Sequence, residues 1–309
     1  MALVLPNNKK FAFTIIDDTD NGTVENTKPV YDYLYEKGII TTKTVWVYPS
    51  RDKFTGGFLQ DEDYLKFILN LKDNGYEIAL HNVGSGSFSR KEIIEGIEIF
   101  NKLIGYYPKM QINHASNPDN IYWGIERYNS IVKLIVKILF GDKRSYYGNK
   151  ENSDYFWGDF CKDKIKYIRN LIFNDINTYK LDKKMPYLVK NKSIYSNYWF
   201  SSSDAHTVEE FNHLVNPKNI DQLVRENGIC IVYTHFASGF VDKNGLLDPV
   251  FKKNVDYLSN RTGWFVPAST LLDYLKVQQE GEYVSSFYLN KLEIKWLIDR
   301  IVKKIRFRR

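Results

Sequence analysis

The sequence has little of what builds a covalent or membrane-spanning framework. Of its 309 residues only two are cysteines, Cys161 and Cys230, too few for a disulfide framework or a cysteine-based zinc site. No apolar run approaches the roughly 18 residues that indicate a spanning helix. The N-terminal segment is short and is interrupted by Pro6, which argues against a secretory signal. Together these features predict a cytoplasmic protein.

Acidic residues are scarce at the C-terminal end of the chain. From Lys295 to Arg309 there are seven Lys or Arg residues and one Asp, a local charge of +6 that equals the net charge of the whole chain. The rest of the sequence is therefore near neutral. A near-neutral body argues against a nucleic-acid-binding groove.

Strand-like apolar runs alternate with amphipathic helical segments along the chain. The runs lie at residues 11–16, 44–48, 76–80, 109–113, 195–200, 229–234 and 264–266. Such alternation implies a parallel sheet with helices outside it. About seven strands, several ending in polar residues, predict an α/β fold of the distorted or incomplete (β/α) barrel type. A doubly wound open sheet is the alternative.

The predicted barrel domain spans residues 1–280. It includes an aromatic-rich insertion at about 128–190, where the alternation is less regular. Ser89 and Glu92 form a capping box that predicts the start of a helix reaching Leu103. Residues 281–309 are predicted to form a separate basic amphipathic helix.

Candidate functional groups follow several of the strand-like runs. The first run ends in Asp17, Asp18 and Asp20, and three later runs are followed by His81, His114 and His235. A single histidine in such a place is usually a hydrogen-bonded structural residue, but three in the same register with a carboxylate cluster are harder to dismiss. Carboxylates that repel each other are stabilised by a cation. Imidazole and carboxylate are the usual ligands of a catalytic divalent metal.

Three motifs resemble those of the polysaccharide deacetylases of carbohydrate esterase family four, which have the NodB-homology fold. They are Ile15–Thr19 for the first motif, Gly75–His81 for the second and Val232–His235 for the fifth. The resemblance covers roughly residues 8 to 275 in motif order. It implies a distorted β/α barrel that removes acetyl groups from a carbohydrate with a divalent metal ion, zinc or else cobalt, manganese or nickel.

The resemblance also implies roles for individual residues. Asp17 would be the catalytic base, Asp18 and His81 metal ligands, and His235 the catalytic acid. The second metal-binding histidine of the family is replaced by Ser85, and the arginine of the third motif is absent. Our inference is that His114 takes the place of the missing ligand.

Substrate-binding candidates come from the same strand ends and from the aromatic residues. The side chains of Asn82 and Asn113 could donate hydrogen bonds to an oxyanion, and Trp123 and Trp199 are candidates for stacking on a sugar ring. Asp204 and His206 could bind substrate or orient His235. Alternatively, Asp204 is a helix N-cap next to an exposed histidine.

Two other functions are compatible with the sequence. A degenerate barrel could bind a glycan or a protein partner without catalysis, as the missing histidine suggests. The sequence Asp18-Thr19-Asp20 with Gly22-Thr23 is also similar to the first motif of haloacid-dehalogenase phosphatases. That family needs an acidic pair after a late strand, where this chain has Thr234-His235-Phe236.

The basic C-terminal segment offers two interpretations. Its apolar residues fall along one side of a helix, with Lys and Arg on the rest and at the end; they are Leu292, Trp296, Leu297, Ile301 and Ile305. Cations at a helix C-terminus are favoured by the helix dipole, so the helix could simply pack on the barrel. The alternative is a peripheral contact of residues 287–309 with an anionic membrane, with Trp296 at the interface.

Overall fold

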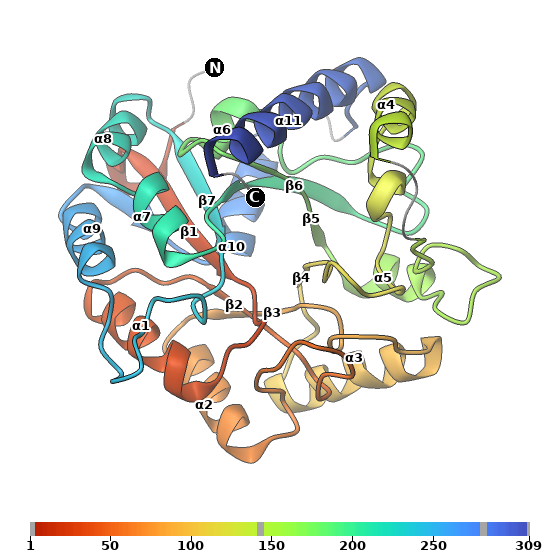
Figure 1. Cartoon of the computed structure of the whole chain (residues 1–309), viewed down its shortest axis with the longest axis horizontal. Coiled ribbons are helices and arrows are strands. Elements are labelled where there is room, and N and C mark those ends of the chain that lie inside the picture. The colour runs from red at the N-terminus through yellow and green to blue at the C-terminus, as the bar shows by residue number, and fades with distance from the viewer. Residues whose placement is uncertain (1–3, 141–144, 279–282, 308–309) are drawn as a thin grey trace.

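The computed structural model describes residues 4–140, 145–278 and 283–307. Parallel strands form the centre of the molecule and helices surround them (Figure 1). The strands are β1 (Phe11–Asp17), β2 (Thr42–Val45), β3 (Glu77–Leu80), β4 (Met110–Gln111), β5 (Tyr167–Phe173), β6 (Tyr198–Asp204), β7 (Ile229–Thr234) and β8 (Gly263–Phe265).

Strand β1 closes the sheet into a barrel. The strand order is β2-β3-β4-β5-β6-β7-β1-β8, and β1 additionally pairs with β2. Along one side, β1 pairs with β7 from Ala12 to Asp17. Along the other side, it pairs first with β8 at Phe11–Phe13 and then with β2 at Ile16 and Asp17. The result is a closed parallel barrel of seven strands with β8 as an extra strand, which confirms the predicted barrel and not the doubly wound open sheet.

One barrel strand was not foreseen from the sequence. Strand β5 lies inside the range 128–190 that was expected to be an insertion, and β8 is the added strand rather than part of the closed ring. Arg169 and Asn170 interrupt the apolar pattern of β5, yet both are buried. These two polar side chains break the apolar run that would indicate a strand, so hydrophobic periodicity alone did not predict β5.

The helices lie outside the strands, as the alternation of elements predicted. Thr23 caps the first of them and forms a complete capping box with Asn26. The predicted capping box of Ser89 and Glu92 is confirmed. The helices are α1 (Val24–Glu36), α2 (Glu62–Asp73), α3 (Arg90–Ile104), α4 (Ser130–Phe140), α5 (Gly158–Lys164), α6 (Thr178–Leu181), α7 (Val208–Leu214), α8 (Pro217–Arg225), α9 (Pro249–Ser259), α10 (Ala268–Val277) and α11 (Ser286–Phe307), with 3-10 turns η1 (Pro6–Asn8) and η2 (Gly124–Arg127).

The C-terminal helix α11 packs against β5 and α4. Trp296 faces inward, with its ring 5.3 Å from that of Tyr128, so it is not the interfacial anchor that the sequence suggested. The side chains of residues 304–309 lie outside the described part of the chain. None of the described helices carries an apolar stretch long enough to cross a bilayer.

A buried ion pair joins β1 to β2 at the end of the barrel where the candidate functional residues lie. The Lys43 ammonium donates to Asp17 Oδ2 over 2.7 Å, and neither side chain has any solvent exposure. The Tyr31 hydroxyl donates to the same oxygen over 2.9 Å, and the Phe236 backbone N–H donates to Asp17 Oδ1 over 2.8 Å. Each buried charge is thus matched, which is the condition for keeping it inside a barrel.

The variant Lys43→Met should lose about 3–5 kcal/mol of unfolding free energy, because it leaves the Asp17 carboxylate buried without its cation. Urea denaturation followed by circular dichroism measures this loss. Lys28→Met is the matched control, since Lys28 pairs with Asp32 over 2.5 Å on the surface, where such pairs contribute no more than about 1 kcal/mol. Equal losses in the two variants would contradict the structural role of the pair.

Candidate metal centre and active site

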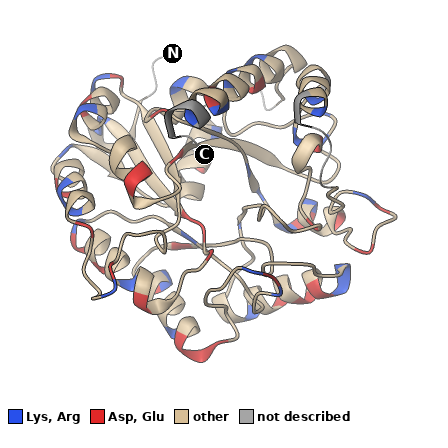
Figure 2. Cartoon of the chain, viewed as in Figure 1, with Lys and Arg blue, Asp and Glu red and all other residues tan. Residues whose placement is uncertain are grey.

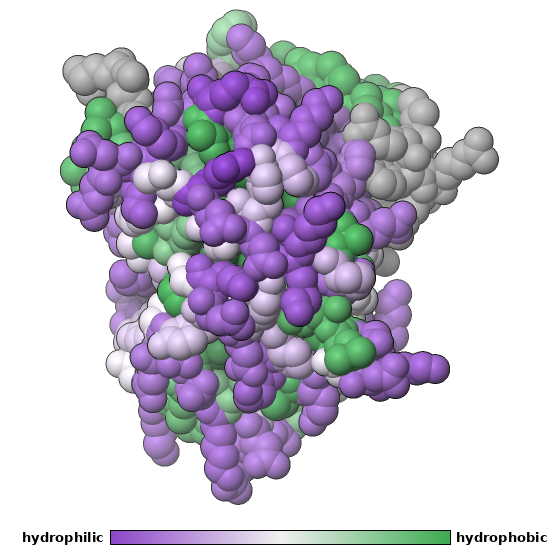
Figure 3. All heavy atoms as spheres, turned by 90° about the vertical axis from the view of Figure 1, so that its left-hand side faces the viewer, coloured by the Kyte–Doolittle hydropathy of each residue, from purple (hydrophilic) through white to green (hydrophobic). Residues whose placement is uncertain are grey.

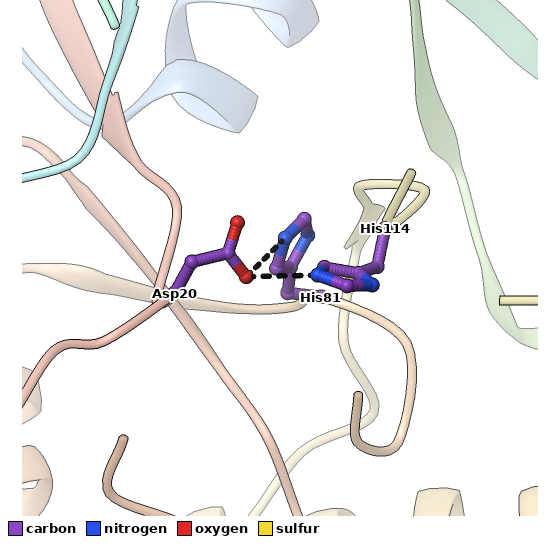
Figure 4. Close-up of side chains that lie close together, drawn as sticks. All are labelled: Asp20, His81 and His114. Atoms are coloured by element: carbon purple, nitrogen blue, oxygen red, sulfur yellow. Dashed lines mark ion pairs between the residues drawn. The ribbon is translucent and has the colours of Figure 1, made fainter. Parts of the chain in front are cut away.

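Three side chains from different strand ends converge on one point. Asp20 lies in the loop after β1, His81 directly after β3, and His114 a few residues after β4 (Figure 4). Asp20 Oδ1 is 3.4 Å from His81 Nε2 and 3.1 Å from His114 Nε2. One ligand atom from each residue lies within 4.8 Å of the other two. This is a compact set of one carboxylate and two imidazoles.

Each imidazole is held by a hydrogen bond at its other nitrogen. His81 Nδ1 is 3.1 Å from the carbonyl oxygen of Ile112, and His114 Nδ1 is 3.1 Å from Asn117 Oδ1. Asn117 is itself fixed, since its amide group donates to the Gly84 carbonyl over 2.8 Å. Because a carbonyl oxygen can only accept, Nδ1 carries a proton, and in the neutral imidazole Nε2 then has its lone pair free. This is how second-shell groups set the tautomer of a metal-binding histidine.

The three facing atoms have no hydrogen-bond partner in the described part of the chain. Asp20 Oδ1, His81 Nε2 and His114 Nε2 are all buried, and all three are left unsatisfied. Leaving three buried polar atoms without partners is costly. A divalent cation would satisfy all three at once, and two imidazoles with one carboxylate suit zinc and related transition metals. The residues present therefore fit a metal.

His235 lies beside this set on the other oxygen of Asp20. His235 Nε2 is 3.0 Å from Asp20 Oδ2, and its Nδ1 is 3.3 Å from the carbonyl oxygen of His206. Burial opposes ionisation of Asp20, yet the facing histidines, His81 first, hold the pKa of its carboxyl well below the usual range. The centre is thus built around an ionised Asp20.

Asp17 and Asp18 lie elsewhere than the sequence analysis assigned them. Asp18 was expected at the metal, but the guanidinium of Arg169 on β5 donates two hydrogen bonds to its carboxylate, over 3.0 and 2.6 Å. Burial raises the pKa of Asp18, but Arg169, His81 and His235 together lower it by more, so that the net shift is downward. Asp17 is fully buried, and its two oxygens already accept three hydrogen bonds. Asp20 therefore takes the position beside the histidines that was predicted for Asp18.

The two asparagines predicted as oxyanion donors are engaged in holding the backbone. Asn82 Oδ1 accepts from the His114 backbone N–H over 2.8 Å, and the Asn82 amide group donates to Asp119 over 2.6 Å. Asn113 exchanges two hydrogen bonds with the backbone of Ile121. Asn82 thus helps to position His114, and one N–H of each amide group is already engaged within the protein.

The two tryptophans predicted to stack on a sugar differ in exposure. Trp199 has no exposed surface, so its ring is part of the core. Trp123 is half-buried, and the Arg127 guanidinium lies 4.2 Å from the centre of its ring. One face of the Trp123 ring is therefore covered by a cation.

Asp204 and His206 have separate surroundings. Thr207, and not Asp204, caps α7, so the N-cap interpretation of Asp204 is wrong. Asp204 instead ends β6 and pairs with two cations of α11, Arg300 and Lys303. The His206 ring lies 4.2 Å from that of His235, and its Nδ1 is 2.9 Å from the Tyr233 hydroxyl. His206 therefore lies where it can orient His235.

Sequence reasoning did not assign roles to Asp20, Arg169 or Asn117. Asp20 could have been found, since it belongs to the same carboxylate cluster as Asp17 and Asp18. A lone arginine inside an apolar strand was the available signal for Arg169. Nothing in the sequence singled out Asn117, because its partner His114 is only three residues away and Asn is common in loops.

Comparison with solved structures places the chain among proteins of one fold. It is similar to a candidate polysaccharide deacetylase from Mycobacterium smegmatis, with a TM-score of 0.50 and 12% identity over 92% of this chain and 96% of that one. For Puue allantoinase the TM-score is 0.54 and the identity 10%, over 89% of this chain and 93% of that one. For a candidate polysaccharide deacetylase from Pseudomonas aeruginosa PAO1 the TM-score is 0.52 and the identity 10%, over 89% of this chain and 94% of that one. The predicted resemblance to the deacetylase fold is thereby confirmed.

Sequence comparisons add nothing to this likeness. No protein-family profile matches the chain, and no curated protein sequence does so either. At identities of 10–12% the structural similarity concerns the fold. The chemistry must therefore be argued from the residues of this chain.

Substitution of one ligand should weaken zinc binding strongly. His114→Ala removes one of three donors, and Asn117→Ala removes the hydrogen bond that orients this donor, for which a loss of about 10- to 100-fold in affinity is typical. Isothermal titration of the metal-stripped protein with zinc measures both losses. His213→Ala on α7 is the control and should bind zinc like the wild type. Unchanged affinity in His114→Ala would remove His114 from the ligand set.

Proposed function

We propose that the protein is a metal-dependent hydrolase that removes an acyl group, acetyl by resemblance, from a carbohydrate. The observation that carries the proposal is the convergence of three unpartnered ligand atoms at the carboxyl ends of barrel strands. In parallel barrels this end holds the chemistry. The fold shared with candidate polysaccharide deacetylases supports the choice of substrate class.

Asp20, His81 and His114 would hold the metal in this proposal, with Asp20 replacing Asp18. A divalent ion bound there would polarise an acyl carbonyl and lower the pKa of a bound water. His81 and His114 present Nε2 because their Nδ1 atoms are engaged. The remaining residues must then move protons to and from the reacting groups.

Asp18 is the better candidate for the general base. A base must be ionised, and although burial raises the pKa of Asp18, Arg169 and the nearby His81 and His235 lower it, so that the carboxyl group stays ionised. Asp17, assigned to this role from the resemblance, is enclosed by Tyr31, Lys43 and the Phe236 backbone. In the proposal Asp17 fixes the strand end and Asp18 accepts the proton from the attacking water.

His235 keeps the role of general acid. Its Nε2 faces the centre through Asp20 Oδ2, and the His206 carbonyl and ring support the other side. From this position the imidazolium can protonate the departing amine or alkoxide. Asp20 would thus serve both functions, binding the metal through one oxygen and orienting the acid through the other.

Two alternatives explain the geometry less well. A degenerate glycan-binding barrel has no use for three buried polar atoms without partners, which cost stability in the absence of a cation. A haloacid-dehalogenase-like phosphatase requires an acidic pair after a late strand, whereas β7 is followed by His235 and Phe236.

The variant Asp18→Asn should lower kcat by about 10²- to 10⁴-fold, the usual contribution of a general base, while zinc affinity stays within a few-fold. Acetate release from acetylated chitin-type and xylan-type oligosaccharides measures turnover, and calorimetry measures zinc binding. Asp32→Asn on exposed α1 is the matched control. Full activity of Asp18→Asn would reject it as the base, and loss of zinc would return it to the ligand set.

A further inference from the structure

Helix α4 is apolar on its outer as well as its inner face. Val132 and Val136 are buried on the inner side, while Leu134 is 60% and Ile138 73% exposed. Ile131 is also exposed, so the outer residues follow one another at helical spacings of three and four. A helix that is hydrophobic all round is normally covered on every side.

Helix α11 repeats this arrangement. Leu289 and Leu292 are buried and Trp296 packs inward. The outer side exposes four apolar residues at spacings of four, three and one, and these are Ile294, Ile298, Ile301 and Val302. Burial of only the inner row thus leaves a second apolar row in contact with solvent.

The two helices belong to one side of the molecule. They contact each other, and the Asn129 backbone N–H at the start of α4 donates to both oxygens of Glu293 on α11, over 3.0 and 2.9 Å. The Asn129 amide group also donates to Asn290 over 3.1 Å. We call the outward residues together the α4–α11 face; they are Ile131, Leu134, Ile138, Ile294, Ile298, Ile301 and Val302.

Exposed apolar side chains are unevenly distributed over the molecule. In the described part of the chain, fifteen large hydrophobic residues are exposed, and eight of them lie on α4 and α11. The opposite side, formed by α1, α7, α8 and α9, is largely hydrophilic with scattered apolar residues (Figure 3). Scattered apolar residues need no explanation, but gathered ones mark an interaction surface.

The charges on the two helices indicate the partner. Lys137 on α4 and Lys291 and Lys295 on α11 are exposed. Helix α4 contains no acidic residue (Figure 2). The acidic residues of α11 have partners, Glu293 in Asn129 and Asp299 in Arg300. An apolar face bordered by lysines complements a surface of anionic headgroups over acyl chains. A second copy of the chain would instead bring like charges together, because a twofold interface apposes the same patch.

The position of α11 connects this face with the candidate metal centre. Arg300 and Lys303 pair with Asp204 at the end of β6, and Asp299 accepts from the Asn174 backbone N–H just after β5. The C-terminal half of α11 therefore lies at the carboxyl ends of the strands, the end that carries His81 and His114. A membrane that binds there would lie next to the mouth of the barrel.

We propose that the α4–α11 face docks the protein peripherally on a membrane of anionic phospholipid. The apolar row enters the headgroup boundary, and the bordering lysines contact the phosphates. This inference stands on the exposed residues and their charges and does not depend on the proposed function.

Vesicle co-sedimentation of the full chain tests the proposal. The wild type should bind vesicles of phosphatidylglycerol and phosphatidylcholine much more tightly than phosphatidylcholine alone, and salt should weaken this binding. The variant Leu134→Ser/Ile298→Ser should bind at least about tenfold more weakly, since two apolar side chains leave the interface. Lys137→Gln/Lys291→Gln/Lys295→Gln should lose on the order of a hundredfold, with about fivefold from each basic residue.

The control variant is Leu246→Ser/Val250→Ser, which removes two exposed apolar residues away from the α4–α11 face and should bind like the wild type. Asp20→Asn should also bind normally, so that failure of the metal centre and failure of docking are distinguished. Two outcomes overturn the proposal. One is equal binding of all variants, and the other is a dimer without lipid affinity that the Leu134→Ser/Ile298→Ser variant dissociates in light scattering, which would identify the face as a contact between copies.

Discussion

Three carboxylates within four residues at the end of β1 are the constraint on which the rest of the structure depends. Asp17 and Asp18 are buried and the side chain of Asp20 is 13% exposed, and carboxylates that repel one another in such surroundings cannot all remain ionised without cations. Each carboxylate receives its partner from a different element of the fold. Strand β2 supplies Lys43 to Asp17, and β5 supplies Arg169 to Asp18.

Asp20 differs from the other two because its partners are histidines. His81, His114 and His235 all reach it, within 3.0 to 3.4 Å. Lys and Arg carry permanent charge, so Asp17 and Asp18 are neutralised by the protein itself. In their neutral form, His81 and His114 leave Asp20 in need of a cation from outside, and their lone pairs can bind it. The partners thus distinguish three carboxylates: Asp17 is structural, Asp18 is held in its ionised form, and Asp20 is placed to bind a metal.

The same matching of charge ties the C-terminal helix to the barrel. Asp204 ends β6 as a buried carboxylate, and Arg300 and Lys303 of α11 neutralise it, with burial opposing and these cations lowering the pKa of its carboxyl. Part of the basic character of the C-terminal segment is therefore used inside the protein. Among the side chains that the structure describes, the lysines left exposed on α4 and α11 are Lys137, Lys291 and Lys295, which border the apolar face.

The sequence by itself determined the class of the fold and the approximate position of the chemistry. Apolar runs alternating with helical segments fix a parallel sheet, and residues that follow such runs meet at its carboxyl edge, so that His81, His114 and His235 could be grouped in advance. Only the tertiary structure decided which carboxylate faces them, because Asp17, Asp18 and Asp20 are chemically identical and differ only in the cation that another strand brings. The same holds for β5, whose Arg169 looks out of place in an apolar strand until its contact with Asp18, 151 residues away, is formed. Periodicity is a local property of the chain, whereas the pairing of buried charges is set by contacts between distant elements.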